Sequence, residues 1–158
     1  MNPSKELARQ FREVAFGGNW TSVNLNSILE DVSWKMASTK TTNLNTIAAL
    51  THHMTYYFKP VRKVLEGGQL IASDKESWEL PKISSDLEWN KFKDEVFEEA
   101  RLFAKAIENY PGDKLEAPFM DEKYGNYFRN ISGIVEHLHY HLGQIKIIKK
   151  LLLENKAI

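Results

Sequence analysis

Residues 130–153 read NISGIVEHLHYHLGQIKIIKKLLL, and the pattern of this stretch decides the fold. The positions expected to be buried recur at alternating spacings of four and three, the period of a helix that packs one face against other helices. These positions are Ile134, Leu138, His141, Ile145, Ile148 and Leu152. We therefore predict that residues 130–153 form a helix of a helical bundle.

Three of the five histidines lie in this stretch. His137 and His141 are one helical turn apart, so their side chains project from the same side of the helix and can converge on one metal ion. His139 falls on the opposite flank and cannot join them unless the helix unwinds. Two histidines at this spacing are also consistent with half-buried side chains bonded to neighbouring helices, so a metal site requires a further ligand.

A second predicted helix, which starts near Thr46 and stops at Gly67 and Gly68, offers that ligand. Pro60 interrupts it and predicts a kink or local break. On a helical wheel His53 lies on the flank of the apolar arc, whereas His52 lies almost opposite the arc and is expected to be solvated. We predict that His53 faces inward, toward the pair on the last helix.

The rest of the chain completes an all-α prediction. Helical periods run through residues 4–14 and 86–109, each bounded by capping and glycine or proline signals, and a short helical pattern lies within the aromatic and polar residues 19–42. Residues 69–85 and 113–126 lack a period and are predicted to be connections. Residues 1–158 thus predict a single domain, a four-helix bundle with a short extra helix and long connections.

Composition narrows the possible functions. Lys plus Arg equals Asp plus Glu at 21 each, so the formal charge is zero and nucleic-acid binding is disfavoured. There is no cysteine, which leaves histidine, carboxylate, amide and water as metal ligands. No stretch has the length of a membrane span and the N-terminus has no apolar signal core, so we expect a cytoplasmic protein without a membrane partner.

The motif HxxxHxGQI at residues 137–145, preceded by TIAALTHH at 46–53, resembles the DinB/YfiT-like superfamily of metal-binding four-helix bundles. The segments GGNWT at 17–21 and DEKYGNY at 121–127 look like one bacterial branch of it. The resemblance implies a metal ligand set of His53, His137 and His141, a divalent ion such as zinc or nickel, and a homodimer. It also implies a metal-dependent transferase or isomerase that acts with a low-molecular-weight thiol.

A divalent ion held by three imidazoles would activate water or a thiol of a small-molecule substrate, for hydrolysis or transfer. Gln144, next to His141 on the wheel, is a candidate to orient a ligand, and Tyr57 and Glu136 are weaker candidates for supporting roles. The alternative is a non-catalytic metal-binding or ligand-binding bundle. A di-iron carboxylate site is disfavoured, because Glu136 with His139 forms the only ExxH element.

Overall fold

The protein is mainly helical in a computed structural model that describes residues 2–41 and 43–154. The longer helices are α1 (Pro3–Phe16), α4 (Ile47–Tyr56), α5 (Phe58–Leu65), α6 (Asp86–Asn109) and α7 (Tyr127–Glu154). The short elements are α2 (Leu25–Leu29), α3 (Trp34–Ser38) and the 3-10 turns η1 (Glu76–Trp78), η2 (Gly112–Lys114) and η3 (Glu122–Tyr124). Among the described residues there is no β-strand, so the all-α prediction is confirmed. Thr42 and the predicted domain limits 1 and 158 lie outside the described ranges.

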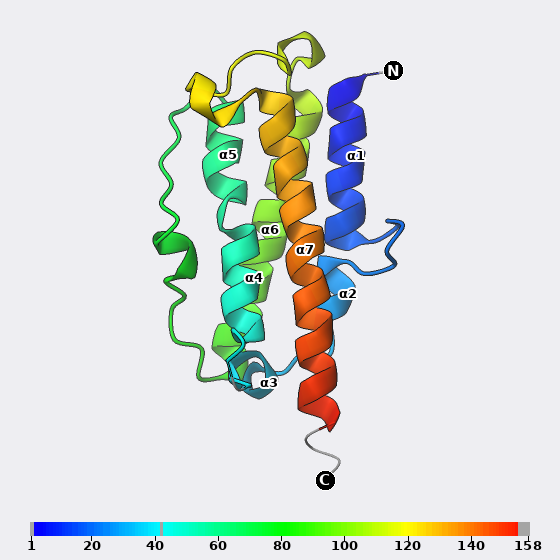
Figure 1. Cartoon of the computed structure of the whole chain (residues 1–158), viewed down its shortest axis with the longest axis vertical. Helices are drawn as coiled ribbons and strands as arrows, with labels where there is room; N and C mark the ends of the chain where they lie inside the picture. The colour runs from blue at the N-terminus through cyan, green and yellow to red at the C-terminus, as the bar shows by residue number, and fades with distance from the viewer. Residues whose placement is uncertain (1, 42, 155–158) are drawn as a thin grey trace.

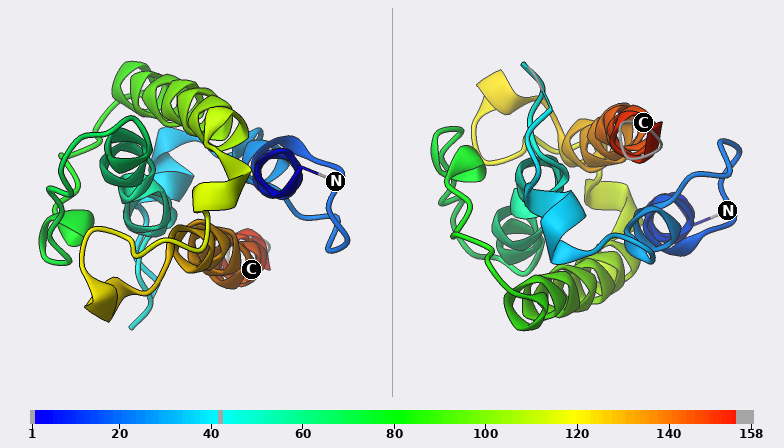
Figure 2. Two further views of the ribbon diagram at one scale, coloured as in Figure 1. Left: turned by 90° about the horizontal axis from the view of Figure 1, so that it is seen from above. Right: turned by 90° about the horizontal axis from the view of Figure 1, so that it is seen from below.

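The longer helices lie side by side, as Figure 1 and the end-on views of Figure 2 show. In Figure 1, α1 and α7 run downward, whereas α4, α5 and α6 run upward. Because α5 and α6 point the same way, the chain must return between them, and residues 66–85 form this long crossover along the outside of α4 and α5. None of the described helices is both long and apolar enough to cross a membrane.

Capping residues set the ends of the helices where the sequence predicted them. The side chain of Asn2 accepts a hydrogen bond from the backbone N–H of Ser4 at 3.0 Å and starts α1. Gly17, with a φ of 126°, ends that helix. Ser85 starts α6, because its Oγ accepts from the backbone N–H of Glu88 at 3.2 Å.

The predicted break at Pro60 is confirmed, and it divides the second long helix into α4 and α5. Proline has no backbone N–H, so it cannot donate to the carbonyl four residues earlier, and the helix ends at Tyr56. The ladder resumes with the bond from the N–H of Val61 to the carbonyl of Tyr57 at 3.1 Å. Tyr57 therefore stands at the joint between the two helices, half-buried.

Aromatic packing joins α1, α5 and α6. The rings of Phe11 in α1 and Phe103 in α6 meet edge to face, with centroids 4.9 Å apart, and Phe58 in α5 stacks on Phe103 at 5.7 Å. All three are fully buried. Burial of each phenylalanine is worth roughly 1.5–3 kcal/mol, so this cluster is a major stabilising contact of the fold.

The structure differs from the sequence prediction in three places. Two short helices, α2 and α3, replace the single one expected before α4, since Ser33 caps α3 by accepting from the N–H of Met36 at 3.2 Å. The connection before α6 contains the turn η1. Helix α7 begins at Tyr127, ahead of the quoted stretch, because the side chain of Asn126 accepts from the N–H of Arg129 at 2.8 Å.

Candidate metal centre

The structure brings together the three histidines that the sequence singled out. His53 of α4 faces His137 and His141 of α7, and their nitrogen atoms lie within 4.8 Å of one another. The Nε2 atom of His137 is 3.2 Å from that of His53 and 2.8 Å from that of His141. His53 and His141 are buried and His137 is half-buried. These residues could hold a metal ion.

Packing of α4 against α7 sets this arrangement. Met54 of α4 and Leu138 of α7 are fully buried in the hydrophobic core. Burial of these apolar positions fixes the rotation of each helix about its own axis. His53 precedes Met54 on α4, and the pair on α7 flanks Leu138, so the rotation that buries the apolar side chains turns the imidazoles toward each other.

Hydrogen bonds at Nδ1 fix the tautomer of two of the rings, His53 and His141. The Ser77 hydroxyl donates to the carbonyl of Asp74 at 2.6 Å, so toward His53 Nδ1, 2.8 Å away, its oxygen must act as the acceptor. His53 therefore carries its proton on Nδ1. His141 likewise donates from Nδ1 to the Oε1 atom of Gln144 at 2.7 Å. Both rings consequently turn an Nε2 lone pair toward His137.

A divalent ion fits the space between these nitrogen atoms. Lone pairs that face each other at 2.8 and 3.2 Å repel unless a proton or a cation lies between them. A tetrahedral zinc ion with bonds of about 2.0–2.1 Å places its nitrogen ligands roughly 3.3 Å apart, close to the two distances that separate His137 from His53 and His141. Within the described part of the chain the cluster consists of these three side chains.

The surroundings favour neutral imidazoles, the form that binds metal. Burial, together with the positive charge that His141 and His53 would carry, lowers the pKa of His137 to about 4. Burial also lowers the pKa of His53, with a smaller contribution from His141. The pKa of His141 is lowered by burial and partly restored by its bond to Gln144. All three side chains are therefore ready to act as ligands at neutral pH.

The crossover supplies contacts that the sequence did not predict. The Trp78 ring stacks on His53 with centroids 3.7 Å apart and covers one side of the site, and Ser77 is completely buried beneath it. Both belong to η1, in residues 69–85 that were predicted to be a surface connection. A three-residue turn is too short to show a period, and the available signal was a tryptophan among the polar residues 73–79.

The three supporting candidates occupy different places. Gln144 contacts His141 as described above. Tyr57 is half-buried, and burial followed by the negative charge of Asp74 raises the pKa of its hydroxyl, which stays protonated at neutral pH. Glu136 is exposed and forms an ion pair with Arg129 at 3.3 Å.

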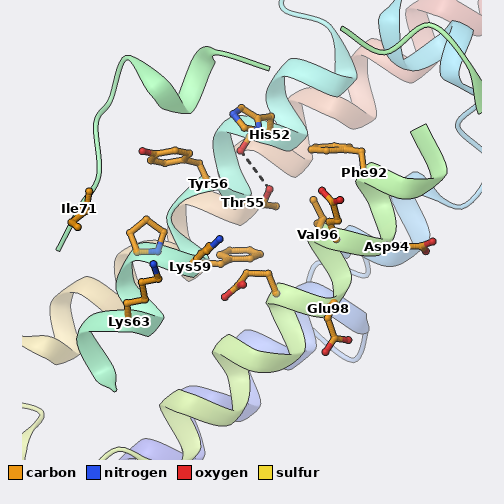
Figure 3. A pocket seen from close by; sticks show the side chains of 14 residues that line it. His52, Thr55, Tyr56, Lys59, Lys63, Ile71, Phe92, Asp94, Val96 and Glu98 are labelled. Atoms are coloured by element: carbon orange, nitrogen blue, oxygen red, sulfur yellow. Dashed lines mark hydrogen bonds between the residues drawn. The ribbon is translucent and has the colours of Figure 1, made fainter. Parts of the chain in front are cut away.

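The two remaining histidines lie outside the cluster. His52 was expected to be solvated, but it is half-buried because the crossover covers it: its Nε2 is 3.3 Å from the carbonyl oxygen of Glu76. It borders a hollow of about 760 Å³ between the α4–α5 column and α6 (Figure 3). In this hollow the ring of His52 lies near that of Phe92, with centroids 6.3 Å apart. His139 is half-buried on the far flank of α7, as predicted.

A smaller cavity adjoins the histidine cluster. It measures about 420 Å³, and both His137 and Tyr57 line it. A small molecule in this cavity would therefore contact one of the three imidazoles directly.

Comparisons with protein-family models, with curated proteins and with solved structures found no match. The fold and the site together define a helical protein with a three-histidine cluster able to hold a metal ion. The case for its function rests on that geometry.

Proposed function

We propose that the protein is a divalent-metal-binding four-helix bundle of the DinB/YfiT-like type, in which His53, His137 and His141 hold the ion through Nε2. The observation that carries this proposal is the convergence of these nitrogen atoms within 4.8 Å, with two tautomers set by Ser77 and Gln144. Zinc or nickel suits a set of neutral imidazole ligands.

We further propose that the centre serves a metal-dependent transferase or hydrolase. A divalent ion with free coordination positions lowers the pKa of a water or thiol bound there, and so supplies a nucleophile near neutral pH. The chain contains no cysteine, so a thiol must come from a small molecule. Ser77 and Gln144 orient the rings, Trp78 covers one side of His53, and Tyr57 lines the adjoining cavity.

The first experiment is elemental analysis of the purified, untagged protein after reconstitution, with folding checked by circular dichroism. We expect about one ion per chain in the wild type and near-complete loss in His53→Ala and His141→Ala. The His139→Ala variant is the matched control, since it removes a histidine from the same helix outside the cluster. A metal-free wild type, or a His53→Ala variant that retains its ion, would overturn the proposal.

Activity is tested on the metal-loaded protein with small thiols and an alkylating electrophile, and separately with an activated ester. We expect thiol consumption or ester hydrolysis above background in the wild type and in His139→Ala, but not in His53→Ala. A protein that holds its metal and accelerates neither reaction would instead support the non-catalytic alternative.

A further inference from the structure

Two further residues, Arg129 and Gly133, lie on the same side of α7 as the candidate ligands His137 and His141. Arg129, Gly133, His137 and His141 follow one another at intervals of four residues. Each interval advances roughly 6 Å along a helix and rotates by only about 40°, so the four positions lie along one side of α7. Arg129 therefore stands two turns before the first ligand of the pair, at the end of α7 where the cavity opens.

Gly133 allows the guanidinium of Arg129 to approach the histidines. A Cβ atom at position 133 would lie 2.8 Å from Nη1 of Arg129, closer than real side chains tolerate. The guanidinium thus lies over the bare backbone of Gly133, one turn nearer to His137 than its own Cα. Glycine is unfavourable inside a helix, and here its missing side chain leaves room for the guanidinium.

The cavity beside the histidines combines this cation with apolar walls. Arg129 is the only charged side chain among the residues that line it, and Val61 and Ile134 supply apolar surface. The guanidinium donates from Nη1 to the carboxylate of Glu136 at 3.3 Å, which occupies one of its nitrogen atoms. Its remaining N–H groups keep the planar fork that matches a carboxylate.

We propose that this cavity binds a small ligand with a carboxylate group, which Arg129 holds while the other end of the ligand lies beside the three histidines. This proposal rests on the proposed function, and it specifies that the substrate carries a negatively charged carboxylate group. A single guanidinium already shared with Glu136 balances one negative charge better than two, which favours a carboxylate over a phosphate. The group over Gly133 is about one helical turn, roughly 6 Å, from the level of His137, so a short linker spans the gap.

The test uses the cobalt-loaded protein and pairs of probe thiols. Mercaptocarboxylates of about three to six carbons are titrated beside the mercaptoalcohols of equal length, since the span to be bridged is roughly 6 Å. The near-ultraviolet charge-transfer band between thiolate sulfur and cobalt reports binding of the thiol end. We expect at least one carboxylate to bind roughly tenfold more tightly than its alcohol, as a charge-assisted hydrogen bond implies.

Variants assign this preference to its source. Arg129→Gln should abolish the preference, and Arg129→Lys should retain part of it. Gly133→Ala should reduce it by displacing the guanidinium, without lowering the unfolding temperature, because alanine favours a helix. Arg101→Gln is the control: it removes an exposed arginine paired with Glu98 on α6, away from the cavity, and should leave the preference intact.

The outcomes separate this proposal from the function on which it rests. Equal binding of both thiol series to the wild type, or a preference that survives in Arg129→Gln, would overturn the carboxylate site and leave the metal centre standing. Cobalt retention without binding of any thiol would overturn both the carboxylate site and the free coordination position. Failure to retain cobalt would overturn the metal centre itself.

Discussion

Ser77 and Gln144 determine what the buried histidines can do, although neither touches the space between the Nε2 atoms. Each accepts a hydrogen bond from an Nδ1 atom and so leaves the opposite nitrogen with its lone pair. Partners of this kind fix both the tautomer and the ring orientation of metal ligands. The affinity of the centre for metal is therefore shared between the three ligands and the two residues behind them.

Replacing Ser77 by alanine should weaken metal binding roughly 10- to 100-fold, the usual effect of removing such a partner. The free energy of unfolding should also fall, by about 1–3 kcal/mol, since a buried N–H loses its acceptor. Competition with a chromophoric chelator measures the affinity. Ser27→Ala, an exposed serine on α2, is the control. Equal affinities of the two variants would show that Ser77 has no part in orienting His53.

The lowered pKa of His137 makes the metal-free protein sensitive to acid. Its pKa of about 4 in the folded protein lies below the value near 6.5 expected when unfolded, so the unfolded chain binds the proton more readily. The stabilisation is complete above pH 6.5 and is lost as the pH falls toward 4. Allowing for partial exposure, we expect a loss on the order of 1–2 kcal/mol.

Urea unfolding of the metal-free protein at several pH values measures this effect. The His137→Asn variant isolates it from the titration of carboxylates, because every other group is retained. We expect a smaller fall in the free energy of unfolding in the variant between pH 6.5 and 4. Parallel curves for the two proteins would contradict the assignment to His137.

At the level of elements, the sequence predicted the long helices, whose apolar positions recur, and missed the short elements, which have no such period. Helices α6 and α7 were predicted because apolar positions recur over many turns, and the break at Pro60 because proline lacks a donor. The wheel selected His53 over His52 for the same reason. Helix α3 and η1 are too short for any period, and their places depend on tertiary contacts. The contacts of Ser77 and Trp78 with His53 could not be predicted from the residues next to them in the sequence.

The N-terminus of α6 offers a way to alter stability without altering the centre. Ser85 caps the helix, and Glu88 reaches back to accept from the N–H of Ser84 at 2.7 Å. We expect Ser85→Ala to lower the free energy of unfolding by about 1 kcal/mol, with metal affinity unchanged. Denaturant titration and chelator competition check the two halves of this prediction. A loss of metal affinity in this variant would show that α6 influences the site.

For the whole molecule, the centre ties together parts of the chain that are remote in sequence. His53 bonds to Ser77 across 24 residues and faces His137 across 84. Because this constellation exists only in the folded state, metal should stabilise the native protein by mass action. At a free ion concentration about 100 times the dissociation constant, the gain is roughly 2.7 kcal/mol.

That gain corresponds to a rise in unfolding temperature of roughly 5–10 °C for a chain of this size. Differential scanning fluorimetry with and without a chelator measures the shift. His139→Ala should show the full rise and His137→Ala almost none. A shift that persists in His137→Ala would indicate that the ion stabilises the protein from another site.

The stacking of Trp78 on His53 makes tryptophan fluorescence a reporter of metal binding. The two rings are 3.7 Å apart and nearly parallel, with an interplanar angle of 12°. An ion on His53 would stand within a few ångströms of the indole, at a distance where copper, nickel or cobalt quench tryptophan emission efficiently. The other three tryptophans lie on different elements and give a constant background. Occupancy of the centre can thus be followed in the unlabelled protein by its fluorescence, and Trp78→Phe silences the signal.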